Sequence, residues 1–551
     1  MKNLMSIETK CLLIQPEFSK HSALNYKDVC EIVGAKYPIP PLNLITVAAL
    51  FPQNWHFKLV DLNIESLNIE AIKWADLVCT GGMLSQQKGI LSLIELAHSF
   101  GKKVAIGGPE PTSQPDLYQH ADYLVLGEGE VTIPDFLTDL SLGKEKGVYH
   151  PSGMARMSEA VVPRFDLIQF KSYLFMGLQV SRGCPYLCEF CNVIELFGRK
   201  PRAKKTDQVI AELDALYKLG YRGHIFFVDD NFLSNKKIIK ELLERIAEWS
   251  SSKKYPFYFA AETSIDLVNN DELLELLRNA DFRYISMGIE TPENEVLQQA
   301  QKNQNMNHSI PEVVKKLMHY GIIVDASFIL GFDNETIQTA SLLIQSIQDS
   351  GICMAMIGTL YALPNTQLLD RLRKEKRLFT EEMIVTDANT EVDQMTSGLN
   401  FITKRNRKQI LSEYIQILES VYSPENYYKR LGILGLNLKV SYKHQPGFKT
   451  GISMLHSFLK ICSIVGFSHQ TGVRFWRLLF KTLIQNPKAI EAFVSLAAMY
   501  IHLSKHAQFI IGITRDKISQ IEAIGEKQYE QSRMRSISKI KIDNHEHAPW
   551  K

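Results

Sequence analysis

The sequence has few cysteines, no long apolar run and almost no net charge. Its 8 cysteines in 551 residues are too few and too unevenly spread for a disulfide scaffold. It has no uncharged apolar stretch of about 18 residues, the length of a membrane span. The nearest approach, 489–513, is interrupted by Glu491, His502, Lys505 and His506. No signal-peptide cleavage site follows the N-terminus, so we expect a cytoplasmic, reducing location in which clustered cysteines bind metal or act in catalysis.

Charge is balanced over the whole chain but not along it. Lys and Arg total 62 and Asp and Glu total 60, and the formal net charge of +2 excludes a basic nucleic-acid coat. Residues 401–551 hold 23 basic and 10 acidic residues, a net +13, which leaves −11 for residues 1–400. The hydrophobic fraction of 45% is enough for three or four domains with real cores. An acidic body with a basic C-terminal region predicts different partners for the two parts, and no nucleic acid.

Residues 9–150 alternate short apolar runs with stretches of helical periodicity. The runs that read as buried strands are 11–15, 57–62, 76–82, 103–108 and 122–127. Buried strands that alternate with helices predict a doubly wound parallel sheet, a Rossmann-like (flavodoxin-like) α/β domain.

Glycine turns follow three of these runs. They are Gly81-Gly82, Gly107-Gly108-Pro109 and Gly127-Glu128-Gly129-Glu130. Ligands of doubly wound sheets lie beyond the carboxyl ends of the strands. One such turn alone is an ordinary strand-to-helix connection, but three at corresponding strand ends favour a flat, bulky ligand that lies on the backbone.

A second alternating series follows a connector near 141–165. Its strand-like runs are 174–181, 223–230, 256–262, 284–290, 324–332 and 354–363. Six βα units are too few for a complete eight-stranded barrel and predict a partial (β/α)6 TIM-type barrel over residues 170–380. From residue 381 the strand signal fades, and residues 381–530 are expected to form a helical domain.

The most specific motif is the run SRGCPYLCEFC, in which Cys184, Cys188 and Cys191 form Cys-x3-Cys-x2-Cys at the end of the first barrel strand. Three thiolates in one loop can hold three irons of a cubane and leave the fourth iron open. The alternatives are a zinc site completed by a distant His, or reactive thiols. Zinc loops usually have a second Cys or His pair, and the sequence has none.

RGCPYLCEFC resembles the cluster-binding motif of the radical S-adenosylmethionine (SAM) superfamily. The stretches IPPLNLITVAAL, VAIGGPEPT and ADYLVLGEGEVTIPDFL resemble the cobalamin (B12)-binding domain that often precedes that barrel. The C-terminal region is similar to the helical extension of a subgroup that includes the hopanoid C-2 methylases. The resemblance extends from residue 9 to about residue 510 and is strongest in the barrel.

The resemblance implies three cofactors: a [4Fe–4S] cluster, SAM and cobalamin. Its motif positions place the cluster on Cys184, Cys188 and Cys191. They assign SAM to Phe190, Gly288, Glu290 and Glu262, and cobalamin to Gly81, Gly82, Gly107, Gly108, Pro109 and Glu128. No residue is assigned a catalytic role. In that family, reductive cleavage of SAM yields the 5′-deoxyadenosyl radical, and cofactors carry the difficult chemistry.

Other strand ends add polar groups at Asp229, Asp230, Asn231 and Ser327. Active sites of barrels collect at this face. Asp229, Asp230 and Glu262 have a second interpretation as caps of the helices that follow them.

The cobalamin pattern departs from many B12 proteins because Asp-x-His-x-x-Gly is absent. None of the histidines before the barrel fits that spacing, so we expect cobalamin to bind base-off without a histidine on cobalt.

The leading functional hypothesis is methylation of an unactivated carbon in a lipid-like or other small-molecule substrate. The alternatives are a cyclase or rearrangement on a tetrapyrrole-like ring, and a non-catalytic corrinoid or cluster sensor. A flavodoxin or ferredoxin would supply the electron. The basic C-terminal region, with GVRFWRLLF at 472–480, predicts peripheral contact with the inner membrane face if the substrate is a polyprenoid lipid; otherwise it is a core-facing helix and a solvated surface.

Overall fold

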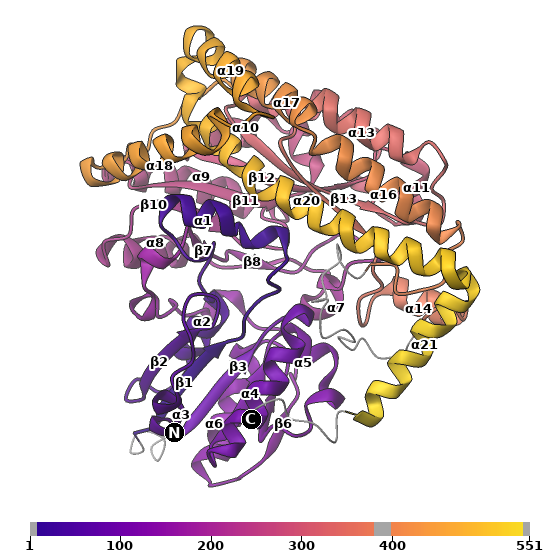
Figure 1. Cartoon of the computed structure of the whole chain (residues 1–551). Coiled ribbons are helices and arrows are strands. Elements are labelled where there is room, and N and C mark those ends of the chain that lie inside the picture. Colours follow the sequence, from indigo (N-terminus) through magenta and orange to yellow (C-terminus); the bar gives the residue numbers. More distant parts are fainter. Residues whose placement is uncertain (1–7, 380–397, 544–551) are drawn as a thin grey trace.

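Two six-stranded parallel sheets form the framework of the computed structural model, which describes residues 8–379 and 398–543 (Figure 1). The first sheet has the order β2-β1-β3-β4-β5-β6. Its strands are β1 (Lys10–Gln15), β2 (His56–Asp61), β3 (Leu77–Gly81), β4 (Lys103–Gly107), β5 (Tyr123–Val125) and β6 (Gly147–Tyr149). The order 2-1-3-4-5 is that of a flavodoxin-like sheet, as the sequence predicted.

Alternate residues of the first sheet face two separate cores. On β1, Leu12 and Ile14 pack with α3 (Ile69–Trp74) and α4 (Gln87–Ser99) on one face. Cys11 and Leu13 of the same strand pack on the other face, with α2 (Leu42–Leu50) and α6 (Gly129–Ser141). Burial on both faces explains why these strands are continuously apolar.

The sixth strand, β6, was missed by the sequence analysis, which placed residues 141–165 in a connector. The strand has three residues and begins with a glycine, and its Val148 is exposed. It lies at the edge of the sheet, paired with β5 alone. A short edge strand has no second covered face, so it carries no apolar run that a sequence pattern could detect.

The second sheet has the order β14-β13-β12-β11-β10-β7, with every pair parallel, which confirms the partial barrel. Its strands are β7 (Met176–Leu178), β10 (Gly223–Phe227), β11 (Phe257–Thr263), β12 (Phe282–Glu290), β13 (Ile323–Leu330) and β14 (Met354–Thr359). The first is shorter than expected, because the chain turns after Leu178 into β8 (Ser181–Arg182), which pairs antiparallel with β9 (Arg202–Ala203).

Helices cover the outside of this sheet, in agreement with the periodicity of the sequence. They are α8 (Thr206–Lys218), α9 (Lys236–Ser252), α10 (Asp271–Asn279), α11 (Asn294–Gln299), α12 (Ile310–His319), α13 (Thr339–Ser350) and α14 (Gln367–Lys374). The short helix α7 (Val193–Phe197) lies instead between the two sheets, where it contacts α5 (Pro109–Ser113). Residues of β12 and β13 alternate between buried and half-buried. The half-buried set, which includes Gly288, Asp325 and Ser327, faces away from the helices into the barrel.

The C-terminal region is helical, as expected. Its elements are α16 (Arg407–Val421), α17 (Pro424–Asn437), α18 (Phe448–Gly466), α19 (Gly472–Gln485), α20 (Ile490–Ile524) and α21 (Glu526–Asp543). Helix α1 (Lys27–Val33) leaves the first sheet and packs against α18 and α20 (Figure 1). Among the described residues, no helix has the length and apolar character needed to cross a membrane.

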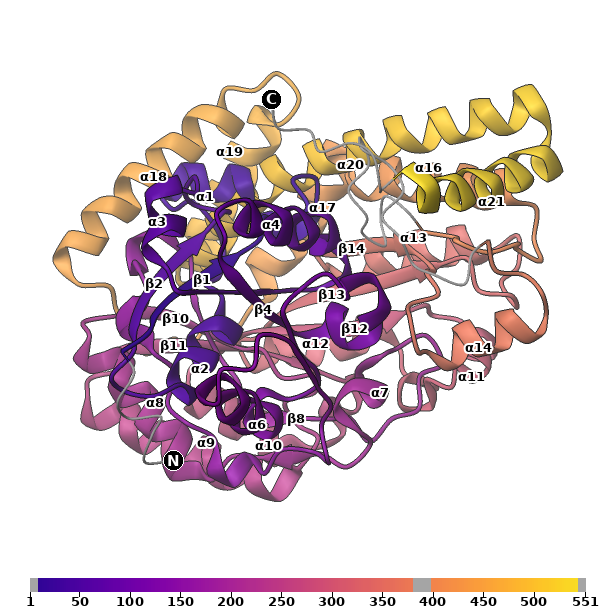
Figure 2. The ribbon, with the colours of Figure 1, turned by 90° about the horizontal axis from the view of Figure 1, so that it is seen from below.

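The first domain lies below the barrel in Figure 1 and in front of it in the view from below (Figure 2), so the two sheets meet at their strand ends. The carboxyl ends of β3, β4 and β5 point toward the carboxyl ends of β7 and β10, because residues from both sets line one cavity. The stacking therefore places the glycine turns of the first sheet opposite the start of the cysteine loop.

Candidate functional site

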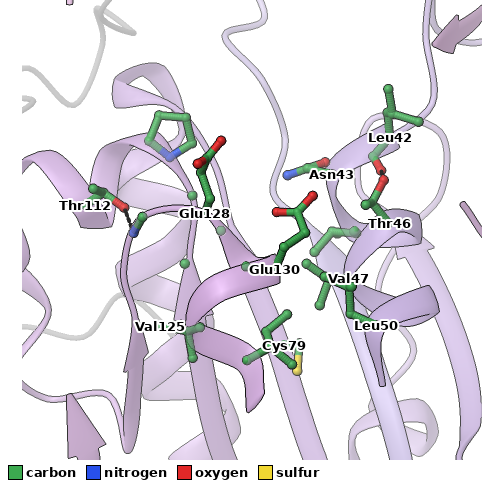
Figure 3. Close-up of a pocket in the computed structure, with 18 of the residues that line it drawn as sticks. Leu42, Asn43, Thr46, Val47, Leu50, Cys79, Thr112, Val125, Glu128 and Glu130 are labelled. Atoms are coloured by element: carbon green, nitrogen blue, oxygen red, sulfur yellow. Dashed lines mark hydrogen bonds between the residues drawn. The ribbon is translucent and has the colours of Figure 1, made fainter. Parts of the chain in front are cut away.

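A cavity of about 320 Å³ separates the first sheet from the barrel. The predicted residues Gly81, Gly107, Gly108, Pro109 and Glu128 all line it. Figure 3 shows the carboxylates of Glu128 and Glu130 and the amide of Asn43 directed into the space between the strand ends and α2. Gly82 is not among the lining residues, and a Cβ there would lie 2.5 Å from the Oε1 atom of Gln86. No histidine is among the described residues that line this cavity.

The glycines at this edge are required by close approach of the backbone. A Cβ on Gly81 would lie 2.1 Å from the carbonyl oxygen of Gly107 on the next strand. Gly108 has φ +97°, a conformation that L side chains rarely adopt. The bare backbone leaves a flat floor, which fits a broad planar ligand such as a corrin.

Glu128 also joins the first sheet to the barrel domain. Its buried carboxylate accepts from Arg182 at 3.1 Å, from Arg202 at 2.8 Å and from the backbone N–H of Ala155 at 2.6 Å. Arg182 also donates two hydrogen bonds of 2.9 Å to Glu130. Burial acts to raise the pKa of Glu130, but these bonds and the charge of Arg182 hold it below its usual range. Because Arg182 is two residues before Cys184, the ion pairs fix the cysteine loop to the glycine edge.

The cysteine loop was expected at the end of the first barrel strand; it begins after the two-residue strand β8 instead, because β7 ends at Leu178. Gly183 has φ +90°, and a Cβ there would lie 2.8 Å from the carbonyl oxygen of Gly198. The N–H of Cys184 donates to that same carbonyl oxygen at 3.2 Å. Gln304 donates to the sulfur of Cys188 at 3.5 Å. The loop is thus held by backbone contacts that leave the three thiols half-buried.

The donor set fits a cubane cluster. Burial raises the pKa of Cys184, and it raises the pKa of Cys191 to about 12. The loop brings the cysteines together, since the N–H of Cys191 donates to the carbonyl oxygen of Cys188 at 3.1 Å. Within residues 8–379 and 398–543, no three His, Cys, Asp or Glu side chains gather around a position for one ion. In a cluster each thiolate binds its own iron, so the three need no common centre.

Glu189, within the motif, is the anchor of the loop. Its buried carboxylate accepts from Arg371 at 2.9 and 3.0 Å, and Arg371 also donates to Asp333 at 2.7 Å. Burial acts to raise the pKa of Asp333, but Arg377 and Arg371 hold it at about 2. The network clamps the cysteine loop to α14 and to the turn after β13.

Asp229 and Asp230 brace the same loop and do not cap a helix. Asp229 accepts from the backbone N–H of Val180 at 3.0 Å and also from Ser181, and Asp230 accepts from the N–H of Gly183 at 3.1 Å. The cap of α9 is Asn235. Burial raises the pKa of Asp229 to about 6. The capping interpretation of these two carboxylates is therefore wrong.

Glu290 pairs with Lys302 beside the cysteine loop. Both side chains are nearly buried, and the ammonium of Lys302 lies 5.6 Å from the ring centroid of Phe190. Burial acts to lower the pKa of Lys302, but Glu290 and Cys188 raise it above its usual value. A Cβ on Gly288 would lie 2.4 Å from the Glu290 carboxylate, so Gly288 makes room for the pair. The structure brings together Phe190, Gly288 and Glu290.

Glu262 lies apart from that pair, inside the barrel. Its side chain is exposed to solvent, but the surrounding protein still desolvates the carboxyl group. This burial, and then the negative charges of Asp230 and Asp325, raise the pKa of Glu262 to about 7. Burial raises the pKa of Asp325 to about 7 as well. Tyr26, from the segment before α1, senses the charges of both Asp325 and Glu262. These groups give the barrel interior a polar wall.

Sequence reasoning missed the residues that hold the site together: Arg182, Arg202, Glu189, Arg371 and Lys302. Arg182 and Glu189 lie within the motif SRGCPYLCEFC, so their position in the sequence could have indicated that they belong to the site. Arg371 and Lys302 follow the motif by more than 100 residues and carry no local pattern.

Glu290→Gln is expected to raise the dissociation constant of SAM roughly tenfold, the effect of losing one hydrogen bond to a charged group. Equilibrium dialysis with anaerobically reconstituted protein measures it. Glu272→Gln, in an exposed ion pair with Lys240, is the control and should change nothing. Unchanged SAM affinity in the Glu290 variant would mean that this carboxylate serves Lys302 alone.

Comparison with known protein families agrees with this geometry. Residues 178–347 match the model of the radical SAM superfamily, and residues 32–137 match the B12 binding domain. Residues 366–514 match a domain of unknown function.

Relatives match over nearly the whole chain. An uncharacterized methyltransferase of Synechocystis sp. is 37% identical over 91% of this chain and 92% of its own length. The hopanoid C-2 methylase of Rhodopseudomonas palustris is 33% identical over 85% and 88%. The radical SAM methyltransferase TsrM from Kitasatospora setae, solved with cobalamin and a [4Fe–4S] cluster bound, shares the fold with a TM-score of 0.57, 14% identity, and coverage of 86% of this chain and 99% of that one. The chain therefore belongs to the cobalamin-dependent radical SAM methyltransferases, enzymes whose cofactors are a [4Fe–4S] cluster, SAM and cobalamin.

Proposed function

We propose that this chain methylates an unactivated carbon of a lipid-like small molecule, with a polyprenoid lipid as the leading substrate class. The identity with a hopanoid C-2 methylase supports the substrate class. The observation that carries the reaction is the shared cavity, which residues of the glycine edge and residues beside the cysteine loop line together. A flavodoxin or ferredoxin at the cytoplasmic face of the membrane would supply the electron.

The residues divide the work between the glycine turns, which line the cavity, and the cysteine loop, which follows the lining residue Arg182. Cys184, Cys188 and Cys191 would hold the cluster, and Glu290 with Phe190 would position SAM. The glycine edge would hold cobalamin by its backbone. When bound, these cofactors supply a radical that removes hydrogen from the substrate carbon and a methyl group that replaces it. Arg182 keeps the two sides in register, because it bonds Glu128 and Glu130 across the cavity.

The experiment is anaerobic turnover of reconstituted protein with methyl-deuterated SAM and a reductant. A hopanoid, a tetrapyrrole and no substrate form the three arms. We expect a hopanoid product that carries one labelled methyl, together with 5′-deoxyadenosine. A labelled or cyclised tetrapyrrole would contradict the lipid assignment, and 5′-deoxyadenosine without methylation in any arm would contradict the methyltransferase assignment for these substrates.

We also propose the domain bounds 9–150, 170–380 and 381–530.

The first of these domains would bind cobalamin without a histidine on cobalt. Electron paramagnetic resonance of bound cob(II)alamin should lack nitrogen superhyperfine splitting from a protein imidazole. This expectation rests on the missing Asp-x-His-x-x-Gly and on the lining of the cavity. Nitrogen splitting from a protein histidine would contradict this expectation.

A further inference from the structure

Helices α18 and α19 carry an unusual share of the exposed apolar side chains in the described part of the chain. Phe448 is 85% exposed, Phe467 81%, Val473 83% and Ile484 80%. Scattered exposed apolar residues are normal, but a contiguous group marks a surface that contacts something else. We call the outer faces of these two helices, 448–467 and 473–484, the α18–α19 surface.

On α18 the exposed residues form a stripe along one helical face. Phe448, Ile452, Leu455 and Leu459 recur at spacings of four, three and four, and each is more than half exposed. The opposite face is used for packing: Ile461 and Val465 are buried, and Lys460 donates to a carbonyl oxygen of α1. Helix α18 is therefore apolar on both sides, although its partners within the described chain cover only one.

Helix α19 repeats the arrangement, with one apolar face buried and another exposed. Phe475 and Leu479 face the core, whereas Val473, Phe480 and Ile484 lie on the opposite, exposed face. The run 472–480 is both a core helix and an exposed apolar edge.

An aromatic contact joins the two helices. The ring centroid of Trp476 lies 6.4 Å from that of Phe467, at the end of α18, and 6.0 Å from that of Phe480. Its indole N–H donates to the carbonyl oxygen of Gly466 at 2.9 Å. The ring contact and this bond hold the end of α18 against the start of α19.

The charge of this region has one sign. Residues 426–490 contain ten Lys and Arg and no Asp or Glu. Arg430 is buried, but the charged residues nearest the exposed stripe of α19, which are Arg474, Arg477 and Lys481, are all exposed. An apolar stripe bordered by basic residues, with no acidic residue over 65 positions, matches a negatively charged surface that has an apolar layer beneath it.

We propose that the α18–α19 surface docks this protein on anionic lipid bilayers, with the apolar stripes inserted among the acyl chains and the basic residues at the phosphates. The lipid-like substrate of the proposed function gives this contact its purpose. Docking itself requires no turnover, so the test below separates the two proposals.

The test is co-sedimentation of the full chain with vesicles of phosphatidylcholine alone or mixed with phosphatidylglycerol. We expect binding to the mixed vesicles only, weakened by added salt. Leu455→Glu with Leu459→Glu should weaken it by at least roughly tenfold, and so should Arg474→Gln, Arg477→Gln and Lys481→Gln together. All variants should keep the circular dichroism spectrum and the rate of 5′-deoxyadenosine formation in solution.

Matched controls use exposed apolar and basic residues elsewhere. Leu142 is 71% exposed and Ile337 77%. Leu142→Glu with Ile337→Glu should bind vesicles as the wild type does, and so should Lys218→Gln, Lys237→Gln and Arg245→Gln together. Equal loss in these controls, equal binding to both vesicle types, or binding to neither would overturn the proposal. It would also be overturned if sedimentation velocity found a dimer that Leu455→Glu and Leu459→Glu dissociate, since the surface would then belong to a second copy.

Discussion

Cys188→Ala is expected to abolish both the cluster and the cleavage of SAM. With Cys188 removed, the loop keeps two thiolates, and a cubane bound by two residues loses iron to solution. The fold should survive, because Cys188 is half-buried and its backbone bond from the N–H of Cys191 remains in the variant, which loses the bond from Gln304 to the sulfur. Iron and sulfide analysis after anaerobic reconstitution measures the first effect, and chromatography of 5′-deoxyadenosine measures the second.

Cys462→Ala is the control for that variant. Cys462 is a buried cysteine of α18, far in sequence from the motif, and its loss should leave iron content and SAM cleavage unchanged. Retention of four irons per chain in the Cys188 variant would refute the assignment of this loop to the cluster.

Arg182→Ala should lower the free energy of unfolding by about 3 kcal/mol at neutral pH. The side chains of Glu128 and Glu130 are only 2% and 14% exposed. The variant therefore leaves two buried negative charges without the positive charge of Arg182 and with little access to water. Urea denaturation measures the free energy of unfolding, and the loss of cobalamin absorbance during the titration is a second readout. Arg182→Lys should rescue only part of it, because a lysine cannot donate the paired bonds that Arg182 gives Glu130.

The pH dependence of this difference has a definite sign. Arg182 lowers the pKa of Glu130 in the folded state, so its stabilisation is present above the unfolded-state pKa and is lost as the pH falls through the folded-state pKa. The gap between wild type and variant should therefore shrink in acid. Arg245→Ala is the matched control: its pair with Glu248 is exposed, at 53% and 70%, and should contribute at most about 0.5 kcal/mol. A comparable loss in both variants would remove the special role of Arg182.

The candidate site shows how far sequence motifs extend. The cysteine triad and the glycine turns were found because each is a local pattern with a backbone reason, such as the positive φ of Gly183 and Gly108. The role of Asp229 was misjudged as a possible cap, because its partners at Val180 and Ser181 are almost fifty residues away. Gly82 was assigned to cobalamin as part of the Gly81-Gly82 turn, and it is not among the residues that line the cavity, so its assignment stays a prediction.

The sequence by itself determined the classes of structure. Strands covered on both faces must be continuously apolar, and amphipathic helices must repeat every 3.6 residues, so both sheets and the helical C-terminal region could be predicted from periodicity. The cysteine triad was recognised from its spacing, and three cysteines within one short loop are neighbours in any fold. That they bind the cluster stays a prediction from the resemblance of the motif.

Only the tertiary structure decided how these parts face one another. The cavity exists because the two sheets stack with their carboxyl ends opposed, and the ion pairs that hold it join Arg182 to residues more than 50 positions away. The exposed stripe of α18 is equally a tertiary outcome. A helix that is apolar on two sides looks like a core helix in sequence, and which side meets protein depends on where α1 and α20 come to rest. Such contacts are set by the summed packing of distant segments, for which the local sequence carries no period.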